Sequence, residues 1–373
     1  MPSVYVHIPF CQSRCIYCDF YSTTSLSLQE RYVDALLKEM EGRKGEWPQR
    51  ARTLSIYIGG GTPSTLPPYL LQRLLEHIIA LFPIEKDAEI TVEANPDDVS
   101  DAWIDALRHS CVNRVSMGVQ TFDDALLHTL RRRHSAQQAR DAVARLQAAG
   151  FRNLSVDLIY GLPGQTLPSW ERDIDEALRL GVPHLSAYSL MYEEGTPITH
   201  MLEAGLIDEM PDECSLQCFQ WLRSKLLAAG YEQYEISNFA LPGWHSRHNS
   251  GYWQGTPYLG FGAGAHSYDG QNTRRANLSD LHTYLDSPLT ACQLELLSPT
   301  DRYNEYIMTR LRTAAGFSLA ELTHCFGTHL RNHSIAAMRP HLEQGNLVCQ
   351  DEVVRLTPKG IFVSNEVMSD LFA

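Results

Sequence analysis

The feature of this chain that most restricts its fold is a regular alternation of short apolar segments and longer amphipathic segments over its first 235 residues. The short segments are rich in β-branched and aliphatic residues, as is typical of parallel strands that are buried on both faces. We expect these strands at Ser3–Ile8, Thr53–Ile58, Ala88–Glu93, Arg114–Val119, Leu154–Ile159 and His184–Leu190. The segments between them have helical apolar spacing, at Leu28–Glu41, Pro68–Leu81, Asp101–Arg108, Ala136–Ala149 and Ser169–Leu180.

Successive strand–helix units of this kind predict an α/β fold in which a parallel sheet curls into a partial, TIM-like (β/α)6 barrel. In such barrels the functional residues gather at the carboxyl ends of the strands. Polar motifs follow the predicted strands directly, at 7–18, 59–62, 93–95, Gln120 and from Asp157 onward. The sequence therefore predicts one site at that end of the barrel.

The pattern changes after about residue 235, so we divide the chain into three parts. Residues 1–235 form the barrel, and residues 236–298 are a connecting segment. Within it, residues 237–277 are rich in Gly, His, Tyr and Trp, which predicts loops with short strands. Residues 299–373 begin with amphipathic helices and end in the hairpin-like stretch GNLVCQDEVVRLTPKG and a short helix. This order predicts a small winged-helix-like α+β module.

Composition narrows the functional classes. The formal net charge of −13 argues against nucleic-acid binding through bulk positive charge. No apolar run reaches the roughly 18 residues that a membrane helix needs, and MPSVYVHIPF is too uncharged for a secretory signal. Nine cysteines, odd in number and mostly scattered, fit reduced thiols. We expect a cytoplasmic protein, with peripheral membrane contact left open.

Three cysteines, Cys11, Cys15 and Cys18, lie close together near the start of the chain with the spacing C-x3-C-x2-C. Structural zinc sites use four ligands, usually from two separated pairs, and no second pair follows here, although His7 keeps zinc open as an alternative. Soft thiolates suit iron and sulfide. Three thiolates on a [4Fe–4S] cube leave one iron free for a small molecule, so the spacing favours an iron–sulfur site with an open position.

This motif, in an α/β barrel context, resembles the hallmark of the radical S-adenosylmethionine (SAM) superfamily. The resemblance implies a barrel of the radical SAM type in which Cys11, Cys15 and Cys18 hold the [4Fe–4S] cluster. It also implies that the amino and carboxylate groups of SAM chelate the fourth iron. An electron from the cluster would then cleave SAM to methionine and a 5′-deoxyadenosyl radical.

The stretch IYIGGGTPS follows a predicted strand and precedes a predicted helix. Glycine-rich turns let backbone groups approach a ligand closely, although a tight turn without a ligand is the alternative. By the resemblance, Gly60, Gly61 and Thr62 belong to the site of the SAM amino group.

Further positions match the porphyrin-related branch of the superfamily as SAM neighbours. Carboxylates and amides accept hydrogen bonds from ribose hydroxyls and the SAM ammonium, and an arginine can pair with the SAM carboxylate. The alternatives are an arginine run that is only a solvated helix face and a glutamate that only caps the next element. The expected residues are Tyr5, Tyr17, Glu93, Gln120, Arg132 and Asp157.

The resemblance covers most of the chain, through YVHIPFC, CDF, GGGTP, EANP, GVQ, His134, DLIYGLPGQT and LTPKG. It is greatest to the oxygen-independent coproporphyrinogen III oxidases and to their haem-chaperone relatives, the HemW family. The oxidases carry a further cysteine two residues after the third, where this chain has Phe20. They also have a long N-terminal extension, for which the position of Cys11 leaves no room. Both differences disfavour the oxidase reaction.

The stretch RHNSGYW matches the HNxxYW signature of the chaperone group. His248 offers an imidazole for haem iron, and Tyr252 and Trp253 offer flat apolar faces to a porphyrin. An ordinary loop whose aromatic residues pack on the barrel is the alternative, and His245 competes with His248 as the ligand. The resemblance favours binding of haem b at His248, Tyr252 and Trp253.

These expectations combine into a haem chaperone that binds a [4Fe–4S] cluster, SAM and haem and passes haem to an acceptor apoprotein such as a membrane respiratory enzyme. The resemblance also suggests an electron donor as a partner, and association into a homodimer. Nucleic acid is not expected as a partner. Two enzymes remain as alternatives: a coproporphyrinogen III oxidase, and a radical SAM enzyme that modifies haem. Whether the chain is an enzyme is left open.

Other candidate ligands have simpler structural interpretations. Cys214 and Cys218 are spaced as one face of a helix and are expected to face the core. His324, His329 and His333 have the spacing of polar positions on a C-terminal helix. The stretch GFGAGAH is expected to allow close packing near the edge of the barrel.

Overall fold

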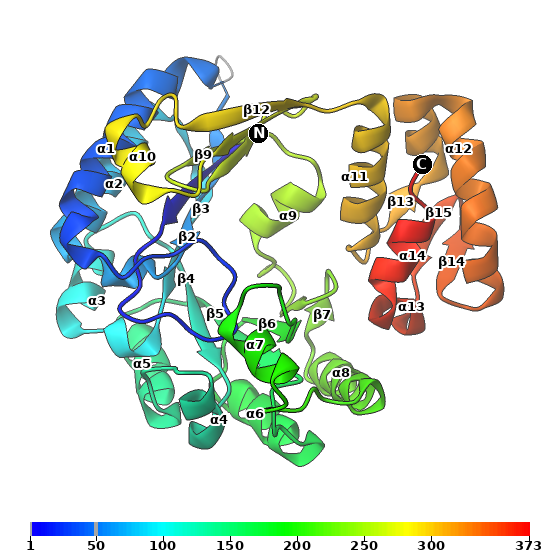
Figure 1. The fold of residues 1–373 in the computed structure, drawn as a ribbon, viewed down its shortest axis with the longest axis horizontal. Helices are drawn as coiled ribbons and strands as arrows, with labels where there is room; N and C mark the ends of the chain where they lie inside the picture. Colours follow the sequence, from blue (N-terminus) through cyan, green and yellow to red (C-terminus); the bar gives the residue numbers. More distant parts are fainter. Residues whose placement is uncertain (1, 48–50) are drawn as a thin grey trace.

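The computed structural model describes residues 2–47 and 51–373. Its main sheet has 12 strands in the order β12-β11-β10-β9-β1-β2-β3-β4-β5-β6-β8-β7, curled into an open barrel (Figure 1). Neighbouring strands from β1 to β6 are parallel. They are β1 (Ser3–Ile8), β2 (Thr53–Gly60), β3 (Ile84–Ala94), β4 (Arg114–Gln120), β5 (Asn153–Tyr160) and β6 (His184–Ser189). The predicted partial α/β barrel is confirmed.

Helices cover the outside of this sheet, and each of the five expected from the apolar spacing is present. They are α1 (Gln29–Arg43), α2 (Pro68–Leu81), α3 (Asp101–Arg108), α5 (Ala136–Ala148) and α6 (Leu167–Arg179). Between and after them lie α4 (Asp124–Thr129), α7 (Pro197–Glu203), α8 (Asp212–Ala228) and the short 3-10 turns η1 (Leu26–Leu28), η2 (Lys44–Glu46), η3 (Pro63–Thr65) and η4 (Pro96–Asp98). Cys218 of α8 is buried as expected, whereas Cys214 is exposed.

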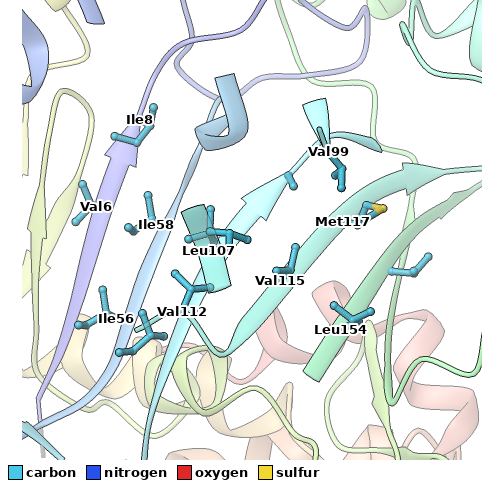
Figure 2. Close-up of a cluster of buried hydrophobic side chains, with 14 of the residues drawn as sticks. Val6, Ile8, Ile56, Ile58, Val99, Leu107, Val112, Val115, Met117 and Leu154 are labelled. Carbon is cyan, nitrogen blue, oxygen red and sulfur yellow. The ribbon is translucent and has the colours of Figure 1, made fainter. Parts of the chain in front are cut away.

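The parallel strands are largely buried on both faces, as expected, but the two faces differ in polarity. Val6, Ile8, Ile56 and Ile58 share one face and cluster with Leu107 of α3 (Figure 2). Because successive side chains of a strand point to opposite faces, the alternate residues line the inside of the barrel. That inner face is polar and includes Ser3, Tyr5, His7, Ser55, Tyr57, Glu89, Glu93, Arg114, Ser116, Ser155, Asp157 and His184.

Residues 236–298 have a larger structural role than a connecting segment, because their strands extend the main sheet at both edges. Strand β9 pairs with β1 in parallel, and β7 and β8 extend the opposite edge. The stretch RHNSGYW forms a short helix, where the composition of 237–277 suggested loops and short strands. Just before this segment lies β7 (Glu232–Gln233), and the segment itself contains β8 (Asn238–Ala240), α9 (Arg247–Trp253), β9 (Tyr258–Phe261), β10 (His266–Tyr268), β11 (Thr273–Asn277), α10 (Leu281–Asp286) and β12 (Cys292–Leu296).

The glycines of GFGAGAH do permit close packing, as expected. A Cβ atom on Gly260 would lie 1.9 Å from the carbonyl oxygen of His266. The buried Glu39 and Arg43 of α1 bind this segment: Arg43 donates to the Gly260 carbonyl at 2.8 Å, and Gly262 N–H donates to Glu39 at 2.9 Å. The stretch therefore ties the added strands to α1.

The C-terminal residues form helices and a second, antiparallel sheet of order β13-β15-β14 with its own cluster of buried apolar side chains. The predicted hairpin is β14 with β15, and Gly327, with φ 80°, interrupts α12. The elements are α11 (Pro299–Leu311), β13 (Phe317–Ser318), α12 (Leu319–Glu343), β14 (Leu347–Gln350), β15 (Val353–Leu356), α13 (Pro358–Phe362) and α14 (Ser364–Asp370). Within residues 2–47 and 51–373, no helix has both the length and the apolar character needed to span a bilayer.

The candidate cluster and cofactor site

A cavity of about 440 Å³ lies at the carboxyl ends of the parallel strands, where the barrel topology predicted a site. It brings together most of the residues singled out from the sequence. They are Cys11, Cys15, Tyr17, Cys18, Gly60, Gly61, Thr62, Glu93, Gln120, Arg132 and Asp157. Tyr5, His248, Tyr252 and Trp253 are not among its lining residues.

The three cysteines lie on the loop that follows β1, at the wall of this cavity. Cys11 Sγ lies 3.3 Å from the hydroxyl of Thr62, and Arg132 Nη1 donates to Cys15 Sγ at 3.4 Å. In the part of the chain that the structure describes, no three His, Cys, Asp or Glu side chains converge on one point suited to a single metal ion. The three thiols line one cavity, as three ligands of a single cube would.

Burial affects the ionisation of these thiols. It raises the pKa of Cys11, and it raises the pKa of Cys18 to about 11. A thiol must lose its proton to become a ligand, and the positive charge of bound iron offsets the cost of holding a thiolate there. The guanidinium of Arg132, beside Cys15, supplies further positive charge.

The glycine-rich turn after β2 makes room for neighbouring protein groups as well as for the cavity. A Cβ on Gly61 would lie 3.0 Å from Cys11 Sγ, and a Cβ on Gly60, which has φ +110°, would lie 2.7 Å from the ring of His7. Larger residues would therefore displace the cysteine loop itself. The sequence predicted close approach to a ligand, and the structure adds close approach to the loop that carries the thiols.

Glu93, at the end of β3, is held by two hydrogen bonds. The hydroxyl of Tyr57 donates to Oε1 at 2.6 Å, and the backbone N–H of Gly60 donates to Oε2 at 3.1 Å. Burial raises the pKa of this carboxyl to about 7, against the lowering effect of those bonds. A carboxyl poised near neutrality beside a cavity is typical of a binding or catalytic site.

Arg132 follows Arg131, which has a left-handed backbone, and lines the cavity beside Cys15 of the cysteine loop. Its Nη2 donates to Asn95 at 2.7 Å and to the Gly118 carbonyl at 2.5 Å, while its buried Nε has no partner among the described residues. Arg131 and Gln120 both have positive φ, at 56° and 71°. A left-handed backbone conformation at two non-glycine residues is strained, and such strain is typical of functional sites.

Asp157 lies across the cavity on β5. Burial raises the pKa of this carboxyl, and the hydroxyls of Ser116 and Ser155 donate to it at 3.2 and 3.3 Å. Tyr17, from the cysteine loop, packs beside Ile159 at the cavity edge. His134 lies outside the cavity lining: it is buried, and its Nε2 is hydrogen-bonded to the Val119 carbonyl at 3.1 Å.

Tyr57 is a contributor that sequence reasoning missed. It binds Glu93 and stacks on His248, with ring centroids 5.0 Å apart, so it joins the cavity to the interior of the barrel. Tyr5 stacks on Tyr57 and is hydrogen-bonded to His7 at 3.0 Å, one layer away from the cavity. The alternation in Ile56-Tyr57-Ile58 places Tyr57 on the inner face and was the available signal.

The HNxxYW residues lie at the other end of the barrel, on α9, and do not form an open haem pocket in this conformation. His248 is 2% exposed, and burial lowers the pKa of its imidazole to about 3. Its Nδ1 is hydrogen-bonded to Ser55 and its Nε2 to Tyr252, each at 2.9 Å. Both ring nitrogens of His248 are therefore hydrogen-bonded in this conformation, and contact of His248 and Tyr252 with haem stays a prediction.

Trp253, the third of these residues, is placed differently. It is partly buried, the Arg312 guanidinium lies 4.9 Å from its ring centroid, and its buried Nε1 has no partner among the described residues. It lines a separate hollow of about 380 Å³ beside the C-terminal module, together with His245.

The cavity residues fit a [4Fe–4S] cluster with a bound amino acid derivative. Three thiols on one loop can hold three corners of a cube, and a buried, unpaired guanidinium nitrogen of Arg132 awaits an acceptor such as a carboxylate. The carboxyls of Glu93 and Asp157 supply acceptors for ammonium or hydroxyl groups.

Comparison with known proteins agrees with this geometry. Residues 5–177 match the sequence profile of the radical SAM superfamily, and residues 297–363 match that of the HemN C-terminal domain. The fold is similar to that of coproporphyrinogen III oxidase (HemN) from Escherichia coli, a radical SAM enzyme, with a TM-score of 0.85 at 23% identity over 100% of this chain and 90% of the other.

Curated relatives extend over almost the whole chain. The heme chaperone HemW of Lactococcus lactis is 37% identical over 98% of this chain and 96% of its own length. HemW of Bacillus subtilis is 37% identical over 98% of both chains, and HemW of Escherichia coli is 36% identical over 83% of this chain and 82% of its own. The family implies a [4Fe–4S] cluster and SAM. The chain therefore belongs to the HemW family of the radical SAM superfamily.

Proposed function

We propose that this protein is a haem chaperone: it binds a [4Fe–4S] cluster, SAM and haem b, and transfers haem to an acceptor apoprotein. The observation that carries the proposal is the near full-length similarity to proteins named heme chaperone HemW, combined with a cavity that gathers three thiols and the polar strand ends. Similarity over the whole length favours a shared role over a shared fold alone.

Within this proposal Cys11, Cys15 and Cys18 hold the cluster, which supplies one-electron chemistry toward SAM when both are bound. Gly60, Gly61 and Thr62 present backbone groups to the SAM amino group, and Glu93 and Asp157 accept from its polar hydrogens. Gln120 and Tyr17 line the space beside them. Tyr5 does not line the cavity, and it supports the site by stacking on Tyr57.

Arg132 is proposed to pair with the SAM carboxylate. Its Nη2 already donates to Asn95 and Gly118, so the pair would use the buried Nε–H, which has no partner among the described residues. Nη1 donates to Cys15 Sγ, and a thiolate bound to iron can still accept that hydrogen bond.

The alternative, coproporphyrinogen III oxidase activity, finds less support. The likeness to the oxidase at 23% identity indicates the fold alone. Phe20, which stands where the oxidases carry their additional cysteine, is 65% exposed and lines the mouth of the cavity. An apolar side chain there cannot donate or accept a proton.

The remaining partners belong to the same proposal. A cytoplasmic chaperone would receive an electron for its cluster from a reductant and deliver haem to a respiratory enzyme, with peripheral contact to the membrane that holds the acceptor. Association into a homodimer is part of the proposal through the family resemblance only.

The test uses the anaerobically reconstituted full chain. Titration with haem should give a saturable Soret band, and the haem-loaded protein should restore activity to a respiratory b-type enzyme prepared without haem, faster than free haem does. Incubation with coproporphyrinogen, SAM and dithionite should yield no protoporphyrinogen beyond one turnover. Multiple-turnover formation of protoporphyrinogen, or haem recovered chemically altered, would overturn the chaperone function.

A further inference from the structure

Three rings of the barrel interior lie against one another between the cofactor cavity and α9. Tyr57 stacks on His248, with ring centroids 5.0 Å apart and planes 27° from parallel. Tyr5 lies beside both rings, with its centroid 6.3 Å from each of theirs. Because aromatic rings at such distances attract one another, the position of each ring depends on its neighbours. The stack therefore connects a side chain of β2 to the helix that carries the HNxxYW residues.

The hydroxyl of Tyr57 belongs to the cofactor site. It donates to Oε1 of Glu93 at 2.6 Å, and the backbone N–H of Gly60 donates to Oε2 at 3.1 Å. Within the proposed function, Gly60 and Glu93 hold the amino group of SAM. An ammonium beside Glu93 favours its carboxylate form, and a hydrogen bond to an ionised acceptor is about twice as strong as one between neutral groups. Bound SAM would therefore strengthen the bond that holds Tyr57 in place.

His248, at the other end of the stack, is closed to a porphyrin in this conformation. It is 2% exposed. Since the Ser55 hydroxyl donates to Ser3, Nδ1 of His248 donates to Ser55, and the lone pair of Nε2 accepts from Tyr252. The predicted contact with haem iron requires this lone pair to leave Tyr252, and the burial of the ring requires α9 to shift. Such a shift would move His248 away from Tyr57.

We propose that Tyr57 is a positioning residue shared by the two sites, and that through it SAM and haem weaken each other's binding. SAM favours the closed arrangement, in which Tyr57 donates to Glu93 and stacks on His248. Haem favours an arrangement in which α9 has shifted and that stack is lost. The inference rests on the proposed function and deepens it, because it gives the cofactor site a role in the release of haem. Two ligands that favour different arrangements weaken each other by the same factor.

The test measures the dissociation constants of haem and SAM in the reconstituted full chain without reductant, so that the cluster does not cleave SAM. Haem binding is followed by Soret absorbance with and without saturating SAM, and SAM binding by isothermal titration calorimetry with and without haem. In the wild type each dissociation constant should rise about 5- to 10-fold when the other ligand is bound. A factor of one, or tighter haem binding in the presence of SAM, would overturn the inference.

Tyr57→Phe tests whether the coupling passes through this residue. The new ring can still stack on His248 but cannot donate to Glu93, so both factors should fall to about one. SAM binding itself should weaken only about 10-fold, so saturation is still reached. Because each factor compares one protein with itself, a general loss of stability does not imitate this result.

The matched control is Tyr303→Phe in the C-terminal module. Tyr303 is also buried, and its hydroxyl donates to the Leu371 carbonyl at 3.0 Å, far along the chain from both sites. This variant should keep the full factor. An undiminished factor in Tyr57→Phe would indicate that the two ligands overlap directly, and would overturn the role of Tyr57.

Ser55→Ala loosens the closed arrangement without touching Glu93. It removes the hydroxyl that is bonded to His248 Nδ1, and Ser55 is not among the residues that line the cofactor cavity. When the arrangement that binds a ligand is a minor population, destabilising the major one raises the apparent affinity. Haem binding without SAM should therefore become about 5-fold tighter, in protein whose fold is checked by circular dichroism. Weaker haem binding in folded Ser55→Ala would contradict a closed arrangement that opposes haem.

These outcomes differ from failure of the proposed function. Absence of a saturable Soret band in the wild type, or of SAM binding to the cluster-loaded protein, would refute the function on which the inference rests. Saturable binding of both ligands with factors of one would refute only the coupling and leave that function standing.

Discussion

Cys15→Ala should abolish cluster assembly, lowering the iron content after anaerobic reconstitution from about four per chain to below about one. The physical reason is that two thiolates cannot hold three corners of a cube, and water does not replace a soft ligand effectively. Iron and acid-labile sulfide analysis, with the visible absorbance of the cluster, measure the result. The variant should also lose SAM binding, because SAM would chelate an iron that is no longer present.

The matched control for this change is Cys325→Ala, an exposed cysteine on α12 far along the chain. It should assemble the cluster as fully as the wild type. A Cys15→Ala protein with undiminished iron and sulfide would remove this thiol from the site, and equal losses in both variants would indicate nonspecific iron binding.

Glu93→Gln should weaken SAM binding about 10- to 100-fold, as expected for loss of a charge-assisted hydrogen bond in a partly enclosed site. Burial raises the pKa of Glu93 to about 7, so the wild-type carboxylate is lost as pH falls through that value. SAM affinity of the wild type should therefore decrease below about pH 7, and the variant should lack this decrease. Isothermal titration calorimetry at pH 6 and pH 8 measures both effects.

The same substitution should stabilise the protein without SAM. A carboxyl whose pKa is raised from 4.5 to about 7 by folding contributes stability that is complete below pH 4.5 and is lost as pH rises through 7. A glutamine carries no such loss and can still pair with Tyr57 and Gly60. At pH 8 the free energy of unfolding should therefore rise by up to about 3 kcal/mol. Parallel loss of stability and of SAM binding would mean that Glu93 is only structural.

The parallel strands and their helices could be predicted because their signals are local. Apolar residues at β1, β2 and β4 cluster over short stretches, and helices such as α5 carry capping residues in the sequence itself, with Ser135 and Gln138 forming a capping box. The strand boundaries were accurate to within a few residues for this reason. The polar inner face was not predicted, because the prediction of these strands rested on their β-branched and aliphatic residues.

The position of α9 could not be predicted, because long-range contacts create it. Ser246 caps the helix, and its hydroxyl donates to Glu89, a carboxylate 157 positions earlier in the chain. Glu89 also accepts the N–H groups of Arg247 and His248. Histidine, asparagine and glycine are poor helix formers, so local propensity indicated a loop. A motif alone does not say whether a side chain faces solvent or the core, and in this conformation His248 is buried.

The residues of the cofactor site likewise divide into those that local sequence signals identify and those that depend on long-range contacts. The spacing of three cysteines and the strand-end motifs identified most of the residues that line the cavity. Tyr57, which holds Glu93, and Asn95, which holds Arg132, depend on pairing between segments that are distant in sequence. Their partners could be assigned only from the folded chain.

The most direct test of the account is the electron paramagnetic resonance (EPR) spectrum of the reduced cluster in the reconstituted full chain, recorded before and after addition of SAM. Three protein thiolates with one open iron predict a single [4Fe–4S] signal whose g-values shift when SAM is added. An identical spectrum with and without SAM, or protein that contains zinc and no acid-labile sulfide, would contradict it.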